Sequence, residues 1–443
     1  MRPIWRRTIL RLVGAGASVS LGGCLDSLDV DTGDDGDPSD GGEHDTTADE
    51  DIEATVFQAD ETSSRPRWAD DESRTGLVAV LQSETDVETF ATRVVGSEER
   101  DDVDEELASW VRETDFEASV ILGVQTVAPN ACYETIEVTD LAVSTVEIPS
   151  ERRAAETTAD EEIGAITGAA AAVDDAGGDV GCAQVITYPT AYVRVTGEDL
   201  PSVAVLAITD GWGEETDVNS TDPLIDPATL PGSVRPDGEP PAVPTALVCD
   251  DEDFERLPST AGGEVAWGET VDERGAAAFA MRADAFDEGD GTGDDGESGG
   301  DGVGSTNESG DGAGYGDSSD ATDDLTFDRG DGVRISLWNV STREQTTGNE
   351  HTYAVEVKTE DGWREVRGTD SQAAVGYTDE RATHPPGGGF DWTVELTENG
   401  LVEERDTTRR LRVCPDLQTG RYRFRYWGLP DEASIAVAFD LAA

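Results

Sequence analysis

An excess of acidic side chains is the feature that most constrains how this chain can fold. The sequence contains 97 Asp and Glu against 31 Lys and Arg, a formal net charge of −66, and Lys358 is its single lysine. Repulsion among like charges destabilises a compact state at ordinary ionic strength. Either the chain is disordered, or it folds in concentrated salt, where the Debye length falls to about 3 Å at 1 M. A content of 36% hydrophobic residues and nine tryptophans favours a protein that folds in salt.

Scarce lysine combined with abundant Asp and Glu resembles the composition of proteins from halophilic archaea. The same charge argues against nucleic acid as a partner, because binding to phosphates needs a cluster of Lys and Arg. It argues equally against binding to anionic lipids, apart from a covalent anchor.

Residues 1–24 have the order of an export signal. Arg6 and Arg7 precede a short apolar run, residues 9–21, and the segment ends in LGGC. The run is shorter than the about 20 residues that a membrane-spanning helix needs, and paired arginines mark twin-arginine export. LGGC resembles a lipobox, the cleavage site of lipoproteins. The resemblance implies a mature chain that begins at a lipid-modified Cys24 and is anchored at the extracytoplasmic face of the cell membrane.

Assigning Cys24 to a lipid leaves an even number of cysteines in an exported chain, where disulfides persist. The four are Cys132, Cys182, Cys249 and Cys414, and they allow three pairings. We expect Cys132–Cys182 and Cys249–Cys414, because each pair then closes within one predicted domain. Four buried free thiols are the alternative. Zinc is disfavoured because no two cysteines have the short spacing that such sites use.

Hydrophobic periodicity predicts an α+β first domain over residues 75–210. Residues 76–81 read as a strand, and apolar residues then recur at helical spacing in two short segments separated by Gly96. We expect the acidic residues 25–74 to form a disordered tether. The Ala-, Gly- and Asp-rich residues 152–180 are predicted to be an insertion, either a loose helix or a disordered loop. Further strands are predicted at 118–124, 133–138, 141–148, 183–195 and 203–208.

Three segments of this domain are similar to the PrcB-like family, which is named for a subunit of a bacterial surface protease complex. They are DFEASVILGVQ (115–125), CYETIEV (132–138) and CAQVITYPTAYVRV (182–195). PNACY, residues 129–133, replaces the glycine-rich turn of that family. The resemblance implies a fold and a binding role more than a named partner. The matching residues are Asp115, Phe116, Gln184, Tyr188, Pro189 and Val193.

A Pro-, Gly- and Asp-rich linker at 211–244 is predicted to precede a second domain, 245–443. Apolar residues there alternate with period two over several segments separated by turns, which predicts an all-β sandwich. An almost wholly Gly, Asp and Ser run at 286–325 is expected to be an acidic disordered loop inside it. Near the C-terminus, Tyr422 lies in the pattern of a tyrosine corner, in which the hydroxyl bonds back across a turn.

Within this second domain, DGWREV (361–366), HPPGGG (384–389) and LQTGRYRFRY (417–426) resemble a family of bacterial immunoglobulin-like domains. The resemblance implies an immunoglobulin-like sandwich with a structural or adhesive role and without a catalytic site.

Arg421, Arg423 and Arg425 alternate with aromatic residues on one predicted strand. They are candidates for an anion-binding face, because Arg engages carboxylates and phosphates bidentately. We favour the alternative that they pair with Asp and Glu across strands and so stabilise the sheet. Substituting all three is then expected to reduce stability rather than binding.

The remaining motifs carry little chemistry. GTGDDG (291–296) fits a dinucleotide fingerprint and GESGG (296–300) a nucleophile elbow, but neither joins a predicted strand to a helix. The histidines are scattered, and nothing places one beside a serine and a carboxylate as a hydrolytic triad requires; they are His44, His351 and His384. Sequons make Asn219, Asn307 and Asn339 candidates for surface glycosylation. For Asn339, which lies on a predicted strand, the alternative is a place in the immunoglobulin-like pattern.

Together these features predict an α+β N-terminal domain, with two short helices and a β-sheet, followed by an all-β immunoglobulin-like sandwich. The expected function is that of a non-catalytic cell-surface lipoprotein, a binding or scaffolding module that works in high salt without cofactor or metal. One alternative is an accessory subunit of a surface protease complex. A second is a hydrolase of unknown substrate, against which the missing motifs argue. The expected partners are the membrane, through the lipid on Cys24, and an extracellular protein such as a surface protease.

Dialysis from concentrated salt into dilute buffer is expected to abolish the near-UV circular dichroism of the protein, because unscreened repulsion among the carboxylates then opposes the compact state. A near-UV spectrum that stays unchanged in dilute buffer would contradict folding that depends on salt.

Overall fold

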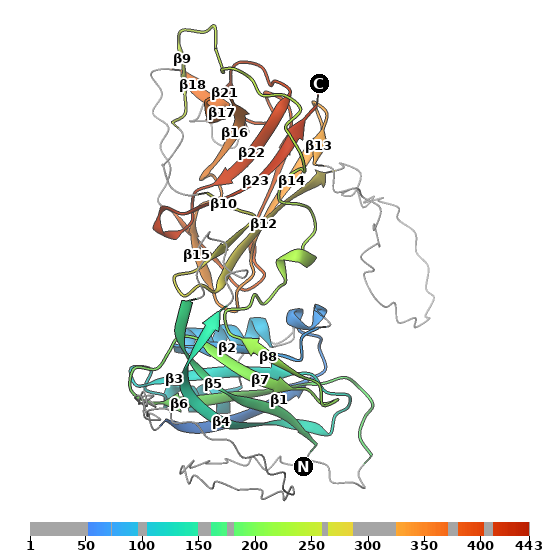
Figure 1. The fold of residues 1–443 in the computed structure, drawn as a ribbon, viewed down its shortest axis with the longest axis vertical. Coiled ribbons are helices and arrows are strands. Elements are labelled where there is room, and N and C mark those ends of the chain that lie inside the picture. Colours follow the sequence, from blue (N-terminus) through green and yellow to red (C-terminus); the bar gives the residue numbers. More distant parts are fainter. Residues whose placement is uncertain are drawn as a thin grey trace, which may run out of the picture.

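The computed structural model describes the chain in nine stretches. Strands account for 49% of the structure and helices for 10%. They form two strand-rich units, one above the other along the long axis of the molecule (Figure 1). The described stretches are 52–71, 73–95, 104–148, 161–174, 181–258, 265–286, 325–370, 380–402 and 411–442.

The first unit contains two four-stranded sheets. One has the order β1-β6-β3-β2, and all its pairs are antiparallel. The other has the order β4-β5-β7-β8, in which only β5 and β7 run parallel. The strands are β1 (Glu53–Thr62), β2 (Gly76–Leu81), β3 (Ser119–Thr126), β4 (Tyr133–Ile148), β5 (Glu161–Asp174), β6 (Tyr188–Thr196), β7 (Ala204–Thr209) and β8 (Glu215–Asn219).

Strand β2 is buried on both faces, so its sheet is the middle one of three layers. The second sheet lies on one side of it and the helices lie on the other. Val78 and Val80 point into a core shared with the second sheet, whereas Leu77, Ala79 and Leu81 point into a core beneath helices. Successive side chains of a strand alternate between faces, so a sheet covered on both sides needs a continuous apolar strand. The sequence GLVAVL supplies one.

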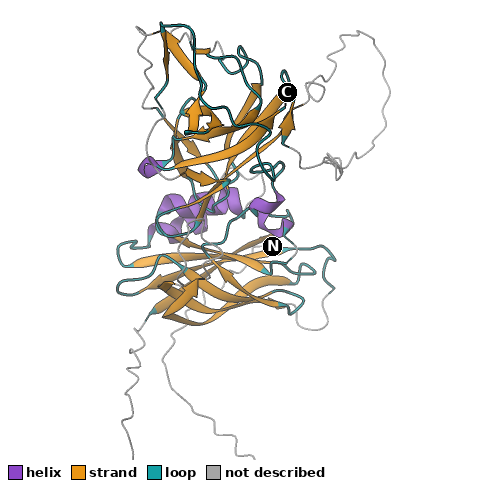
Figure 2. Cartoon of the chain, turned by 45° about the horizontal axis from the view of Figure 1, so that its top comes forward, coloured by secondary structure: helices purple, strands orange, loops and turns teal. Residues whose placement is uncertain are grey.

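The helical layer consists of α1 (Glu84–Thr89), which continues into a π-helical turn (Phe90–Val94), and α2 (Glu105–Arg112). The Ser83 hydroxyl accepts a hydrogen bond from the Asp86 amide at 3.1 Å and caps α1. Phe90 lies directly on β3, where a Cβ added at Gly123 would come within 2.6 Å of its ring. The helices lie between the strands of the two units (Figure 2).

The prediction of an α+β first domain is wrong, although both short helices are present. The unit is built from eight strands in two packed sheets, and the helices only cover one sheet face. Three of these strands, β1, β5 and β8, arise from segments whose composition had indicated a tether, an insertion and a linker.

The predicted domain boundaries change accordingly. Strand β1 lies inside the predicted tether 25–74, yet it pairs with β6 and packs Val56 against the inter-sheet core. Strand β5 lies inside the predicted insertion 152–180 and pairs with β4 along nearly its whole length. Strand β8 lies inside the predicted linker 211–244. Residues 25–51 of the tether and nearly all of the acidic loop 286–325 lie outside the described residues.

The second unit is a β-sandwich. Its larger sheet has the order β10-β23-β22-β16-β17, with β13 also on β23, and its smaller sheet is β11-β12-β14-β20. The larger sheet contains β10 (Val265–Trp267), β13 (Thr326–Phe327), β16 (Tyr353–Thr359), β17 (Gly362–Glu365), β22 (Gly420–Tyr426) and β23 (Ser434–Leu441), and the smaller sheet contains β11 (Glu269–Val271), β12 (Ala277–Phe286), β14 (Gly332–Asn339) and β20 (Gly389–Glu395).

Short elements complete the fold. Strand β15 (Gln345–Gly348) pairs with β19 (Arg381–His384). Strand β18 (Arg367–Asp370) lies between β9 (Phe254–Arg256) and β21 (Arg412–Val413). The described residues also form the 3-10 turns η1 (Arg67–Asp70), η4 (Pro227–Thr229) and η6 (Pro430–Glu432).

The core of the sandwich joins both sheets through aromatic side chains. Trp392 of β20 lies 4.9 Å from Phe424 and 5.5 Å from Tyr426 of β22, measured between ring centroids. The predicted tyrosine corner is confirmed, because the Tyr422 hydroxyl donates to the Gln418 carbonyl at 2.7 Å. Burial raises the pKa of Tyr422 to about 12, so this hydroxyl stays protonated and able to donate.

Both predicted disulfides are confirmed. Cys132 pairs with Cys182 in the first unit, and their Cα atoms lie 5.6 Å apart. Cys249 pairs with Cys414 in the second unit at a Cα distance of 5.4 Å. Next to the second bridge, Arg256 donates to the Cys414 carbonyl at 2.8 Å. Each bridge therefore closes within one folded unit.

The arginines of β22 pair across strands and do not form an anion-binding face. Arg421 makes a bidentate contact with Asp440 at 2.8 and 2.9 Å. Arg423 contacts Glu356 at 2.6 Å, and the Glu356 side chain is 0% exposed. Arg425 donates to the Ser434 hydroxyl at 3.1 Å.

Tryptophans enclose the Arg423 pair on the outer face of the larger sheet. The guanidinium of Arg423 lies 4.6 Å from the ring centroid of Trp363 and 6.0 Å from that of Trp267. Stacking of a cation on indole is favourable, and more so when water is excluded. The side chains expected to present a charged surface are therefore largely covered.

His384 ends β19 in an apolar setting. Its Nε2 lies 2.8 Å from the Thr347 hydroxyl. Its ring makes T-shaped contacts with Phe279 and Phe390, at centroid distances of 6.0 and 4.6 Å. Burial lowers the pKa of the imidazole. His384 is thus a buried histidine at the end of a strand.

Glu356→Ala is expected to reduce the free energy of unfolding by about 3–5 kcal/mol, because it leaves Arg423 buried without its carboxylate. The control is Arg334→Ala. Arg334 contacts Asp284 at 3.1 Å, but its side chain is 45% exposed, so we expect a loss below about 1 kcal/mol. Denaturant titration in high salt measures both, and equal losses would contradict the distinction.

His384 is expected to make stability depend on pH. Well above about pH 6.5 the imidazole is neutral in both the folded and the unfolded chain. As the pH falls, the unfolded chain binds a proton first, because the pKa of His384 is lower in the folded protein. The free energy of unfolding therefore falls as the pH falls. His384→Gln should flatten this slope in thermal unfolding from pH 7 to 5. The exposed His351→Gln is the control, and a His384→Gln slope equal to that of the unsubstituted protein would refute the assignment.

Candidate functional site

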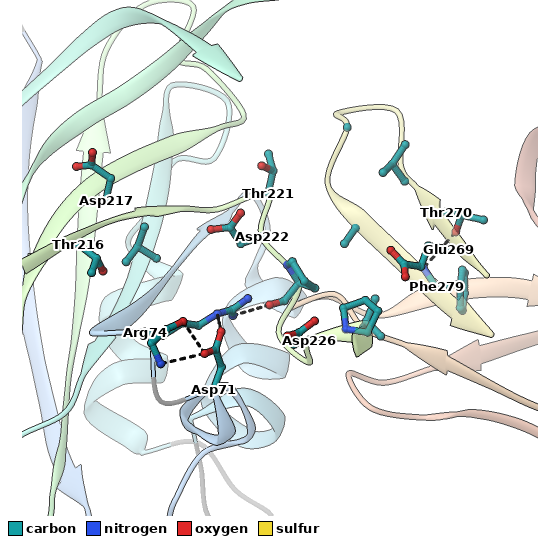
Figure 3. Close-up of a pocket in the computed structure, with 18 residues that line it drawn as sticks. Asp71, Arg74, Thr216, Asp217, Thr221, Asp222, Asp226, Glu269, Thr270 and Phe279 are labelled. Atoms are coloured by element: carbon teal, nitrogen blue, oxygen red, sulfur yellow. Dashed lines mark hydrogen bonds and ion pairs between the residues drawn. The ribbon is translucent and has the colours of Figure 1, made fainter. Parts of the chain in front are cut away.

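A cleft of about 620 Å³ lies where the two units meet. One wall comes from β8 and the segment after it, and the other comes from β11, β12 and the end of β14. Figure 3 shows Thr216 and Asp217 on the first wall and Glu269 and Thr270 on the second. The lining residues are Asp71, Ser73, Arg74, Thr216, Asp217, Val218, Thr221, Asp222, Pro223, Asp226, Pro227, Glu269, Thr270, Val271, Gly275, Ala277, Phe279 and Val340.

Hydrogen bonds between the units hold the two walls together. The Leu224 amide donates to the Val340 carbonyl at 2.6 Å, and the Ala277 amide donates to the Thr221 carbonyl at 3.2 Å. Beside the cleft, the Arg343 guanidinium donates to the carbonyl of Val80 in β2. The first two bonds use backbone groups of the segment after β8, which the sequence had indicated to be a linker.

A second set of contacts connects side chains across the same junction. Arg274 of the β11–β12 turn donates to the Gln82 side chain at 2.9 Å. Asp272 holds this turn, because its carboxylate accepts hydrogen bonds from the Arg274 and Ala276 amides. The close approach of Arg67 to Gly387 adds a contact between η1 and the turn before β20. The cleft is therefore a groove between two units that are joined on several sides.

The lining of the cleft is acidic. It contains five carboxylates, and Arg74 is the one basic residue among the described residues that line it. Arg74 is held by Asp71 at 3.2 Å and donates to the Pro223 carbonyl at 2.7 Å. The hydrogen bond from the Ser73 hydroxyl to Asp71, assisted by Arg74, keeps the pKa of Asp71 below its usual value against the opposing effect of burial.

Several of the cleft carboxylates already have structural roles. Asp226 caps η4 by accepting from the Ala228 amide at 2.9 Å, and Glu269 contacts Arg282 at 2.9 Å. Asp222 accepts from the Asn219 amide at 3.3 Å. Carboxylates and threonine hydroxyls remain the main polar groups facing the groove. Such a surface can accept hydrogen bonds and balance positive charge on a ligand.

The predicted export and lipid residues, Arg6, Arg7 and Cys24, lie outside the described residues, as do His44 and the sequon at Asn307. The motifs at 291–300 also lie outside them. Within the part that the structure describes, no group of three or more His, Cys, Asp and Glu could hold a metal ion, and no helix is long and apolar enough to span a membrane.

The structure disfavours glycosylation at the candidate Asn339. Its side chain is 0% exposed, and its Nδ2 donates to the carbonyls of Arg343 at 2.6 Å and His384 at 2.9 Å. A glycan on this nitrogen would displace both bonds and has no space. Asn219 is also buried, and its side-chain carbonyl accepts from the Thr221 amide at 2.9 Å, so the structure disfavours it as well.

Residues that carry the resemblance to PrcB-like domains serve packing and turns. The Asp115 carboxylate accepts from the Glu117 amide at 3.0 Å, and Phe116 packs against the core beneath the helices. Tyr188 and Val193 are buried in β6, whereas Gln184 is exposed in the loop before it. The structure does not bring Gln184 together with Asp115 as a site.

Sequence patterns missed the cleft because its residues come from both units. Its nearest sequence signal is the run TDPLIDPAT at 221–229, which is rich in Asp and Pro and resembles any linker. The scattered polar residues become a site only where β8 and β12 lie on opposite walls of the cleft.

No family model matches this chain, and no curated protein or solved structure matches it. The PrcB-like and immunoglobulin-like assignments therefore remain resemblances of short segments.

Proposed function

We propose that this chain is a non-catalytic binding or scaffolding protein, held at the extracytoplasmic face of the membrane by a lipid on Cys24. The observation that carries the proposal is the cleft between two units that hydrogen bonds join into one body. A groove of about 620 Å³ is within the usual range for a ligand site. Its carboxylates suit a partner that offers positive charge or hydrogen-bond donors, such as an arginine-containing segment of another polypeptide.

The two disulfides support the extracytoplasmic location. Disulfides persist in oxidising compartments and are rare where thiols are kept reduced. With Cys24 assigned to the lipid, every other cysteine of the chain is in a bridge. The acidic composition supports a setting in concentrated salt, where such a surface is screened.

The form of the second unit supports a scaffolding role. Two packed sheets and the tyrosine corner at Tyr422 are features of immunoglobulin-like sandwiches. We therefore assign the second unit to that architecture and infer that it holds one wall of the cleft in place.

Affinity purification of the mature protein from membranes in high salt tests the proposal. We expect an N-terminal peptide that begins at lipidated Cys24, and a partner whose recovery falls in an Asp217→Asn, Glu269→Gln double variant, because both cleft walls lose charge. The matched control replaces two exposed carboxylates outside the cleft, Glu88→Gln and Glu117→Gln.

Equal recovery of the partner with both double variants would exclude the cleft as its binding site. A protease recovered in constant ratio would instead assign the chain as an accessory subunit of a surface protease. Hydrolase activity that one point substitution abolishes would overturn the non-catalytic assignment.

A further inference from the structure

Three large apolar side chains are exposed in two neighbouring loops of the first unit. Val185 is 42% exposed, Ile186 49% and Trp212 55%. Val185 and Ile186 lie in the loop before β6, and Trp212 lies in the tight turn between β7 and β8. We call these three residues the apolar tip. Large exposed apolar groups that gather in one place mark interaction surfaces, whereas isolated ones do not.

Backbone hydrogen bonds place the two loops on either side of one segment. The amides and carbonyls of Ala128 and Thr187 pair at 2.9 and 3.1 Å, and the Gly211 amide donates to the Val127 carbonyl at 2.9 Å. Neighbouring extended segments lie about 4.8 Å apart, so the two loops run about 10 Å apart. At that spacing, one binding partner can contact both Ile186 and Trp212.

Backbone hydrogen bonds and a disulfide hold the loops of the tip in place. The Cys132–Cys182 disulfide and the bond from the Ala131 amide to the Ala183 carbonyl, at 3.1 Å, fix the first loop. The Asp210 carboxylate accepts from the amides of Trp212 at 2.8 Å and Glu214 at 2.9 Å and fixes the second. The apolar side chains are thus presented on ordered turns, which lowers the entropy lost when they bind.

Covalent attachment at Cys24 would keep a lipid surface within reach of the tip. Residues 25–51 separate that cysteine from the first described residue, Ile52. Fully extended, this segment spans at most about 90–95 Å. Trp beside aliphatic residues suits the boundary between headgroups and acyl chains. The acidic flank of the tip, the exposed Glu214 and Glu215, selects against anionic headgroups.

We propose that the apolar tip docks onto a neutral-headgroup region of the membrane that carries the anchor, and so orients the first unit on that surface. This inference rests on the proposed function, because the lipid on Cys24 is what keeps the membrane close. The tip adds a second, reversible contact to the covalent one, and two such signals hold a protein at a membrane more firmly than one.

Quenching of tryptophan fluorescence by brominated lipid tests the proposal on the mature anchored protein, reconstituted into phosphatidylcholine vesicles in high salt. We expect quenching in the unsubstituted protein and its loss in Trp212→Phe. Ile186→Ser should weaken quenching of the retained Trp212, since it removes apolar area that would be buried in lipid. The matched control is Val248→Ser, an apolar residue of the second unit that is 69% exposed and should leave quenching unchanged.

The outcomes separate the two proposals. If the vesicles float with protein attached but Trp212→Phe is quenched as much as the unsubstituted protein, the tip does not meet lipid and the inference is wrong while the anchor stands. If mass spectrometry finds no lipid on Cys24, both fall. If Trp212→Ser instead removes a co-purified polypeptide without changing quenching, the tip is a protein-docking surface and the membrane assignment is overturned.

Discussion

Burial of one sheet on both faces is the constraint on which the rest of this structure depends. The β1-β6-β3-β2 sheet contacts the second sheet on one side and the helices on the other. In a chain of net charge −66, apolar contact has to be concentrated where few charged side chains intrude. Strand β2, GLVAVL, satisfies this with an uninterrupted apolar run.

The contacts between the two units depend on the burial of this sheet. The helical layer lies on the side of the sheet that faces the second unit, and the end of β2 supplies the Val80 carbonyl that accepts from Arg343. The segment after β8 runs across the same junction and bonds to the end of β14 through Leu224 and Val340. The acidic cleft is the space left between these contacts, so its shape depends on both units.

Much of the structure could be predicted from local patterns, and the failures have physical causes. The disulfide pairing was predictable because each bridge closes within a domain, and Tyr422 because its turn has a distinctive pattern. Strand β5 was missed because Ala and Gly carry little apolar signal, although Ile166 and Ala170 are fully buried in the core. Strand β1 was missed because acidic residues surround it, while pairing with β6 supplies its stability. The cleft joins residues that are far apart in the sequence, which no local pattern records.

We propose that this two-unit body lies outside the cell, anchored by lipid and available to partners. Digestion of intact cells at growth salt with an added protease, followed by detection of the second unit, tests this claim most directly. We predict that the protein is cleaved or released from intact cells while a cytoplasmic marker stays whole. Protection of the protein until the cells are lysed would contradict the account.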